Sequence, residues 1–526
     1  MRKAAVVHLA LLLGLASCRK QVTPVLVDAG SLGIGSGYTA SCNGDFPSWI
    51  SQNPPVPDGN GDVNPHEPGV QKAFELAQSY PLGSPVFVGN TVDHYDPPLP
   101  NQDAPWRAWS NLSNATQRAH YLDALKSYFL ANMSDPSIAF DATKNNQNLA
   151  NRFWYHVPMM TAANTRRREP YHGVTNERAL RPSEQTHWLT AGADLRAVAI
   201  GYYNFLGGYT IGQVFKSGDL SQTDPTKGRF IDGALVFKLL FAEYQPARIS
   251  ATPNPLLNSP SWWTQDPANP SGALTEMRLL QVDVAVKDDH FASTTGWVFA
   301  TYVYDERLTA SEPNPWRRLT PVGIMWGNDP SVTGSTGTLA ETWTNPPGPL
   351  PGLPPAFADH LGRAGRLIGP VDDPVSSCLS CHSTAEVDPS KAGNANHTLY
   401  FGAVTKPAAG CDPMVWFRDL ASGTPFGHAI SCPPPADTST AGLVSLDYSL
   451  QMQEGVASVF DFGNTNPCLG VTPPPAPPPP APPSPPPSRA DKFHFRKLHA
   501  APTAVKLDLK AQPHFIGPDP PEAVLR

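Results

Sequence analysis

The sequence has little charge and few long apolar stretches. Asp, Glu, Lys and Arg make up only 16% of the 526 residues, against the roughly 25% that is usual in soluble domains. Beyond the N-terminal segment no apolar run approaches the roughly 18 residues that a membrane span requires, so we expect no spanning helix. The formal net charge of −7 also argues against a nucleic-acid partner, because such partners select basic surfaces.

Phosphate-binding loops and internal repeats are also missing. The glycines of GSGYTASCNG (35–44) do not match the dinucleotide fingerprint, and no glycine-rich loop precedes a predicted helix. Proline is abundant instead, with 61 residues, which is typical of a loop-rich exported protein. The apolar share of 40% is ample for a core in a chain of this length.

The N-terminus carries an export signal. Arg2 and Lys3 precede an apolar stretch that is too short to span a bilayer permanently. The stretch ends in Leu-Ala-Ser-Cys, which resembles a bacterial lipobox, so we predict that residues 1–17 are removed and Cys18 is lipidated. The alternative is an ordinary cleaved signal with a cysteine nearby. The expected location is the periplasm or the outer membrane of a bacterium, with the lipid as membrane anchor.

The pentapeptide CLSCH, at 378–382, is the motif with the most specific chemistry. On a helical turn, positions i, i+3 and i+4 share one face, so Cys378, Cys381 and His382 are expected to point the same way. Two thiols in this arrangement can add across the vinyl groups of a haem, while the imidazole reaches the iron. We therefore predict one covalent haem c, with His382 as the iron ligand.

Three other uses of this motif compete with haem attachment. The two cysteines could form a redox disulfide, or they could pair with other cysteines as structural staples. Zinc would need two more ligands, usually from another paired motif, and the sequence has no second C-x-x-C. Haem is favoured because bacterial c-type haem is attached outside the cytoplasm, in agreement with the export signal.

Ser376 and Ser377 are candidates to cap the short helix.

The remaining cysteines predict disulfides. Seven cysteines are present, and lipid and haem account for three of them. The remaining ones are Cys42, Cys411, Cys432 and Cys468. An even remainder in an oxidising compartment suggests two disulfides, and all three possible pairings stay open.

Two helices and a set of strands are expected in the body of the chain. The apolar spacing predicts helices over 116–133 and 183–206. Short β-branched and aromatic runs bounded by turn residues predict strands over 233–244, 277–288, 296–307 and 319–329. The last three runs are close together, so an antiparallel meander is the simplest topology. The expected fold class is α+β, with a helical N-terminal half and an antiparallel sheet packed next to a C-terminal haem helix.

Changes in composition divide the chain into segments. We assign residues 1–17 to the signal peptide, 18–110 to a lipid-anchored loop-rich arm, 111–225 to a helical region, 226–345 to an antiparallel sheet region, 346–468 to the haem-attachment region with disulfides, 469–488 to a proline-rich linker and 489–526 to a disordered tail. The linker contains 12 prolines in the 15 residues 473–487, which predicts a stiff polyproline II spacer.

The order of these motifs resembles a known family. FIDGALVFKLLF, VDVAVKD, TGWVFATYVYD and CLSCH follow one another between about 228 and 385, as in the cytochrome P-460 and cytochrome c′-beta group. The resemblance implies sheet strands packed on a haem bound near the C-terminus. In the P-460 enzymes it further implies a strand lysine bonded to the porphyrin edge, which supports oxidation of hydroxylamine or similar nitrogen compounds. Lys287 matches that position best and Lys238 is second, unless both are ordinary edge-strand lysines.

The second axial position of the iron separates the possible functions. A Met or His ligand there makes an electron carrier, whereas an open face admits a small molecule. The candidate ligands are Met277, Met325, Met414, Met452, His290, His360, His397 and His428. An open face in the P-460-like interpretation would be lined by Phe237, Trp297, Phe299 or Tyr302.

A second polar site is conceivable in the aromatic and arginine-rich segment upstream. It would combine His156, His172 and His187 with Arg166, Arg167 and Arg168 to attract an anion, although surface salt links are the simpler interpretation.

We therefore expect an exported haem-c lipoprotein that exchanges electrons with an unknown redox partner. The alternatives are a P-460-like enzyme or gas binder acting on hydroxylamine, NO or related molecules, and an anchored protein that its haem only stabilises. Whether the chain is an enzyme is left open.

Overall fold

The computed structural model describes the central part of the chain. The described residues are 80–81, 84–88, 91–96, 104–140, 142, 145, 153–157, 175–215, 223–250, 254–264, 275–334, 337–345, 360–389, 412–427 and 442–462. The predictions for the signal peptide, the proline-rich linker and the tail lie outside them, as do those for Cys18, Cys42, Cys411, Cys432, Cys468, His172, His397, His428, Arg166, Arg167 and Arg168.

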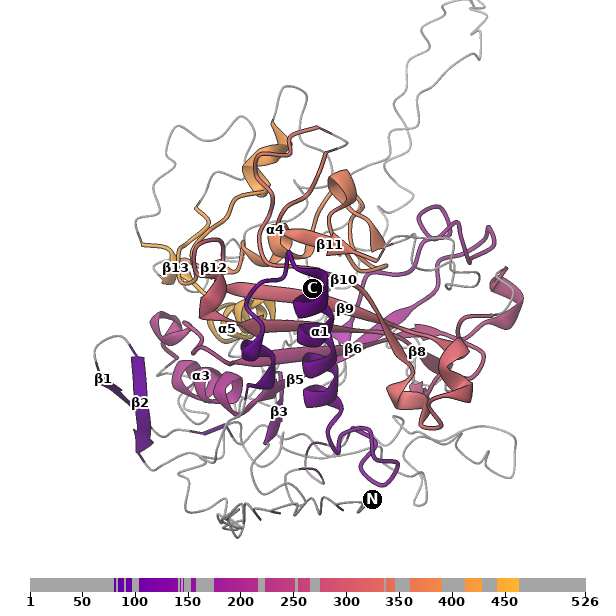
Figure 1. The fold of residues 1–526 in the computed structure, drawn as a ribbon, viewed down its shortest axis with the longest axis horizontal. Helices are drawn as coiled ribbons and strands as arrows, with labels where there is room; N and C mark the ends of the chain where they lie inside the picture. Colours follow the sequence, from indigo (N-terminus) through magenta and orange to yellow (C-terminus); the bar gives the residue numbers. More distant parts are fainter. Residues whose placement is uncertain are drawn as a thin grey trace, which may run out of the picture.

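A nine-stranded antiparallel sheet forms the centre of the molecule (Figure 1). Its main path runs β11-β10-β9-β8-β6-β5-β3, with β4 added on β5 and β7 added on β8. The strands are β3 (Trp154–His156), β4 (Thr175–Asn176), β5 (Ala197–Asn204), β6 (Leu235–Glu243), β7 (Ser261–Thr264), β8 (Thr275–Lys287), β9 (Trp297–Tyr304), β10 (Leu319–Met325) and β11 (Thr342–Thr344). The four predicted strands and the antiparallel meander are thereby confirmed, as β6, β8, β9 and β10.

Smaller elements surround this sheet. Two further strand pairs are β1 (Ser84–Val88) with β2 (Thr91–Asp96), and β12 (Glu386–Val387) with β13 (Val444–Ser445). The described α-helices are α1 (Ala115–Leu130), α3 (Phe205–Phe215), α4 (Cys378–His382) and α5 (Leu450–Phe462). Short 3-10 turns cover Pro105–Ala108, Pro225–Lys227, Pro246–Arg248, Asp289–Phe291, Glu306–Ala310, Pro315–Arg317, Arg363–Gly365 and Pro413–Trp416. Among the described residues, no helix is both long and apolar enough to cross a membrane.

The first predicted helix is confirmed and the second is wrong. α1 begins after Asn114, whose side chain accepts hydrogen bonds from the backbone N–H groups of Thr116 and Gln117. The prediction over 183–206 fails because β5 occupies 197–204, and α3 begins only at Phe205. Every residue of β5 is buried, so the strand is apolar at nearly every position and its sequence carries no alternation that separates strand from helix.

The N-terminal half is consequently not helical throughout. The region 111–225 contributes β3, β4 and β5 to the central sheet. The mixture of a few helices with a large antiparallel sheet makes the fold α+β.

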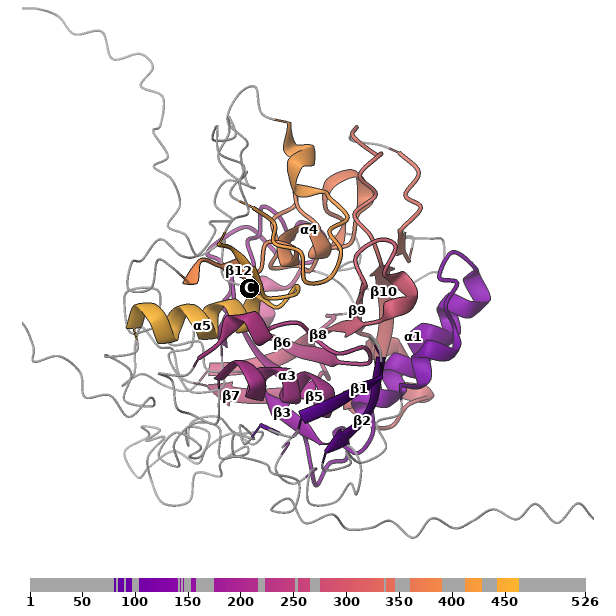
Figure 2. The same ribbon diagram turned by 90° about the vertical axis from the view of Figure 1, so that its left-hand side faces the viewer.

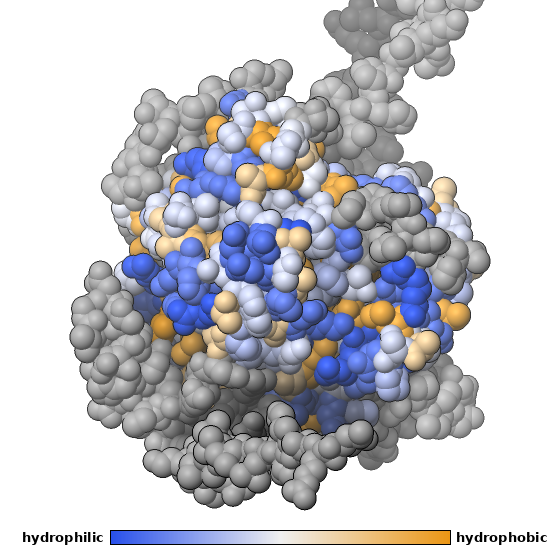
Figure 3. All heavy atoms as spheres, in the orientation of Figure 1, coloured by the Kyte–Doolittle hydropathy of each residue, from blue (hydrophilic) through white to orange (hydrophobic). Residues whose placement is uncertain are grey.

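The two faces of the sheet carry different structures. On one face, α1 packs Leu125 and Phe129 against Phe237 and Tyr302. On the other face, α3, α4 and α5 form a second apolar cluster with Phe299 and neighbouring strand residues. Figure 2 shows the sheet between α1 and α5. The outer side of α1 is exposed, and Figure 3 shows hydrophilic side chains with scattered apolar groups across that face of the molecule.

Candidate functional site

The helix α4 is short and depends on its cap. Ser377 accepts a hydrogen bond from the Ser380 N–H at 3.0 Å, and the Ser380 hydroxyl accepts one from the Ser377 N–H at 2.8 Å. This reciprocal capping box confirms the predicted role of Ser377. Ser376 instead donates to the carbonyl of Asp373 at 2.8 Å. Five residues are too few for a helix to be stable alone, so the cap and the buried Leu379 fix the direction of α4.

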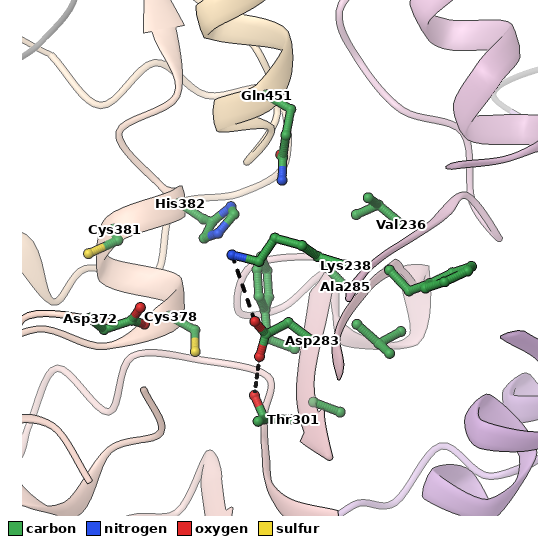
Figure 4. Close-up of a pocket in the computed structure, with 14 residues that line it drawn as sticks. Val236, Lys238, Asp283, Ala285, Thr301, Asp372, Cys378, Cys381, His382 and Gln451 are labelled. Carbon is green, nitrogen blue, oxygen red and sulfur yellow. Dashed lines mark hydrogen bonds and ion pairs between the residues drawn. The ribbon is translucent and has the colours of Figure 1, made fainter. Parts of the chain in front are cut away.

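A cavity lies between α4 and the sheet (Figure 4). The space within it is about 580 Å³, a figure that includes a part open to solvent. The lining residues are Val236, Phe237, Lys238, Asp283, Val284, Ala285, Phe299, Ala300, Thr301, Asp372, Cys378, Cys381, His382 and Gln451. All three reactive residues of CLSCH thus line one cavity, opposite side chains from β6, β8 and β9.

The two cysteines are free thiols. Burial raises the pKa of Cys378 well above its usual value and that of Cys381 to about 12, so both are protonated at neutral pH. No disulfide joins them in the structure. In Figure 4 the sulfur of Cys378 lies on the side of the strands, whereas that of Cys381 points away from them. A reaction of both thiols in the cavity requires Cys381 to change its side-chain rotamer.

Zinc binding gains no support from the described residues. They contain no group of three or more His, Cys, Asp or Glu side chains arranged to hold a metal ion. The possible disulfide partners of the staple alternative lie outside the described residues.

The imidazole of His382 is held in one tautomer. Its Nδ1 lies 2.8 Å from the carbonyl oxygen of Tyr448. A carbonyl only accepts hydrogen bonds, so Nδ1 carries the proton and Nε2 keeps a lone pair. Burial lowers the pKa of His382 to about 4, while the hydrogen bond to Tyr448 acts in the opposite direction. The ring centroids of Phe299 and His382 lie 4.7 Å apart. The imidazole is therefore buried and neutral, and its hydrogen bond to Tyr448 fixes its orientation.

The sheet side of the cavity carries a polar row. Lys238, Asp283 and Thr301 lie opposite one another on β6, β8 and β9. The Lys238 ammonium is 3.8 Å from an Asp283 oxygen and 3.6 Å from an oxygen of the buried Glu177. The Thr301 hydroxyl donates to Asp283 at 2.9 Å. With Asp372 also in the lining, the cavity has more acidic than basic groups, which favours a neutral or cationic small ligand over an anion.

The structure separates the two lysines singled out by the family resemblance. Lys238 lines the cavity. Lys287 does not belong to that lining; it lies at the end of β8, opposite Trp297, and its buried ammonium pairs with Asp289. Of the two lysines, only Lys238 therefore shares the cavity lining with Cys378, Cys381 and His382.

The candidate sixth ligands are placed elsewhere. Of the described candidates, Met277, Met325, Met414, Met452, His290 and His360 do not line the cavity. Met277 packs on the face covered by α1, and the other three methionines lie in or against the cluster of α3, α4 and α5. His290 pairs with Asp288, while the buried His360 bonds to Gln281 at 2.8 Å.

The four aromatic residues expected to line an open face of the iron do not all lie in the cavity lining. Phe299 and Phe237 both belong to the cavity lining, but the ring of Phe237 stacks on Phe129 on the face covered by α1; Trp297 and Tyr302 are not part of the lining. Tyr302 points to the other face, where its hydroxyl donates to the Leu122 carbonyl at 2.7 Å. Trp297 shares the face of Phe299, since the two are separated by two positions on β9.

The second polar site does not form from its described members. His156 is buried in β3 and packs on Tyr202, with ring centroids 4.9 Å apart, whereas His187 is exposed in a turn. The other members lie outside the described residues.

Sequence reasoning missed most of the sheet side of the cavity. Asp283 interrupts the apolar VDVAVKD run, and a carboxylate in a buried strand was a detectable signal. Asp372 lies in the loop shortly before α4 and Gln451 lies in α5, and no local sequence pattern marks either residue.

Glu386 lies on β12, shortly after CLSCH, and is fully buried. Its two oxygens accept hydrogen bonds from the Gly427 N–H at 3.0 and 3.2 Å. Burial raises the pKa of this carboxyl to about 7, although the N–H groups of Gly427 and Phe426 oppose the shift. The folded chain therefore keeps a proton that the unfolded chain releases above about pH 4.5, so Glu386 reduces stability as the pH rises towards 7.

Replacement Glu386→Gln should remove this pH dependence. The free energy of unfolding of the variant minus that of wild type is expected to rise by up to about 3 kcal/mol from pH 5 to pH 8. Denaturant unfolding of both proteins at the two pH values measures the change. A stability difference that is the same at both pH values would contradict the assignment.

Comparison with known proteins gave no match: neither a family model, nor a curated protein, nor a solved structure was found to be similar to this chain.

Proposed function

We propose that CLSCH attaches one haem c in the cavity between α4 and the sheet, and that the chain has a redox role. The observation that carries this proposal is that Cys378, Cys381 and the neutral imidazole of His382 all line one cavity. The His382 tautomer supports it further, because iron-ligating histidines commonly donate their other ring N–H to a carbonyl or carboxylate.

The residues present fit covalent attachment without a further reactant. The S–H bond of each cysteine would add across one vinyl group of the haem, which would form one C–S and one C–H bond with no leaving group. Cys378 and Cys381 would supply the two thioethers, and His382 would bind the iron through Nε2. Haem supplies one-electron redox chemistry when it is bound. The surrounding protein positions it and controls its access to water.

The location follows from the N-terminal sequence. We propose that the chain is exported, lipidated at Cys18 and anchored to a membrane in the periplasm or at the outer membrane, where c-type haem is attached. A redox partner protein is required for an electron-transfer role, and the sequence contains no motif that identifies it.

A small-molecule site is the second candidate, in line with the P-460 resemblance. The support for it is that the described lining contains Lys238 and none of the candidate sixth ligands. An open face beside an acidic polar row suits a neutral molecule such as NO or hydroxylamine. The third candidate is a haem that only stabilises the fold. In that case the bound haem would show no redox activity.

The spectrum of the purified, reduced protein tests these alternatives. Sharp α and β bands from a six-coordinate low-spin haem would support electron transfer alone. A five-coordinate high-spin spectrum that changes on addition of CO or NO would support the small-molecule site. A preparation that lacks covalently bound haem would contradict the proposal as a whole.

The lysine of the P-460-like alternative is tested by peptide mapping. If a lysine bonds to the porphyrin, digestion should release a crosslinked product that joins the peptide of Lys238 to that of CLSCH. Lys238→Arg is expected to abolish this product and Lys287→Arg to preserve it, because only Lys238 lines the cavity. Loss of the product in Lys287→Arg alone would contradict this assignment.

A further inference from the structure

An unusual turn supplies the carbonyl that binds His382. Asp447 and Tyr448 both have left-handed backbone conformations, with φ of 50° and 68°. Asp tolerates this region moderately well, but a bulky residue such as tyrosine is a genuine outlier there. Consecutive non-glycine residues in this conformation persist only where the surrounding structure holds them.

The turn connects β13 to α5 and directs a backbone oxygen at the imidazole. The Tyr448 carbonyl accepts the hydrogen bond from His382 Nδ1 at 2.8 Å. The Tyr448 hydroxyl donates to the Leu420 carbonyl at 2.6 Å, which fixes the side chain of the same residue. An ordinary right-handed conformation at 448 would turn the carbonyl elsewhere, so the hydrogen bond to His382 depends on the turn.

The carboxylate of Asp447 holds this turn in place. It is fully buried and accepts three hydrogen bonds: from the Phe230 N–H at 2.8 Å, the Trp297 indole N–H at 3.0 Å and the Gly423 N–H at 3.1 Å. The donors belong to three separate segments, one of which is β9. Hydrogen bonds to a buried carboxylate are among the stronger ones in proteins, so Asp447 ties the turn rigidly to the sheet.

We infer that Asp447 is the positioning residue for the iron ligand: by holding the left-handed turn it aims the Tyr448 carbonyl at His382 Nδ1 and so fixes the tautomer and electron donation of the imidazole. This inference rests on the proposed function. A hydrogen bond at Nδ1 makes the opposite nitrogen a stronger ligand, which stabilises oxidised iron. Weakening the turn should therefore raise the reduction potential.

The test compares two variants of the full-length, haem-loaded protein. Asp447→Ala removes all three acceptor contacts, whereas Asp447→Asn keeps a side-chain oxygen and a residue type that tolerates the left-handed region. Spectroelectrochemical titration should give the lowest potential for wild type, an intermediate one for the asparagine variant and the highest for the alanine variant. An unchanged potential in Asp447→Ala would overturn the inference.

Asp305→Ala serves as the matched control. Asp305 is also a buried carboxylate next to β9, but it bonds to Arg307 and Thr320 and does not line the cavity. Its loss should lower the free energy of unfolding without moving the potential. A potential that rises equally in Asp305→Ala would assign the effect to general destabilisation, and would also overturn the inference.

A second readout does not need haem. In the unloaded chain, ¹⁵N NMR should show His382 protonated at Nδ1, with its signals identified by their loss in His382→Asn. Asp447→Ala should shift the population towards the Nε2-protonated tautomer, and an unchanged tautomer would overturn the inference. If wild type binds no haem but the tautomer shifts as expected, the proposed function fails while the positioning by Asp447 stands.

Discussion

Replacing Cys378 and Cys381 together with alanine is expected to abolish covalent haem attachment completely. Cys378 and Cys381 both line the cavity beside His382, and each would supply one thioether, Cys381 after a change of side-chain rotamer. The double variant has no nucleophilic sulfur left in the motif. Haem-dependent peroxidase staining of a denaturing gel, after expression with a c-type haem maturation system, measures the covalent product. Wild type should stain and the double variant should not.

His290→Ala is the matched control for this experiment. His290 pairs with Asp288 and does not line the cavity, so its loss should leave the staining unchanged. Equal staining of the double cysteine variant and wild type would show that any covalent haem is bound elsewhere in the chain.

The second large effect is expected at Arg366, which connects two loops near α4. Its buried guanidinium donates to the backbone carbonyls of Asn328 and Asp329 at 2.8 Å, of Val332 at 3.0 Å and of Arg363 at 3.1 Å. It also lies 4.6 Å from the ring centroid of Phe417. Arg366→Ala leaves these carbonyls without their donor and should lower the free energy of unfolding by about 3–5 kcal/mol.

Denaturant unfolding measures this loss, with Arg363→Ala as the control. Arg363 is partly exposed and donates to the Thr333 carbonyl at 3.1 Å, so its replacement should change stability by less than about 1 kcal/mol. A loss of no more than about 1 kcal/mol in Arg366→Ala would mean that the buried hydrogen bonds of Arg366 contribute little to stability.

The elements that could be predicted from sequence are those with local signals. α1 has a regular apolar spacing and a capping asparagine, and β6, β8, β9 and β10 are β-branched and aromatic runs between turn residues. β5 could not be recognised, because a strand buried along its whole length shows no alternation. Its place near one edge of the sheet depends on pairing with β6 on one side and with β3 and β4 on the other, segments that are separated from it in the sequence.

The same distinction applies to the candidate site. CLSCH and its serine cap lie within one short stretch of chain, so their chemistry could be inferred from spacing alone. The opposite wall of the cavity could not be inferred in this way, because the register of three strands is what brings Lys238, Asp283 and Thr301 into one row. That register also explains why Lys287, the better match by motif, lies outside the cavity lining while Lys238 is part of it.

Mass spectrometry of the mature wild-type protein tests the central claim most directly. The peptide that contains residues 378–382 is predicted to carry the added mass of one haem through two thioether bonds, and the pyridine haemochrome spectrum should give one haem per chain. A peptide of unmodified mass, with both cysteines still titratable as thiols after expression with a c-type maturation system, would contradict the account.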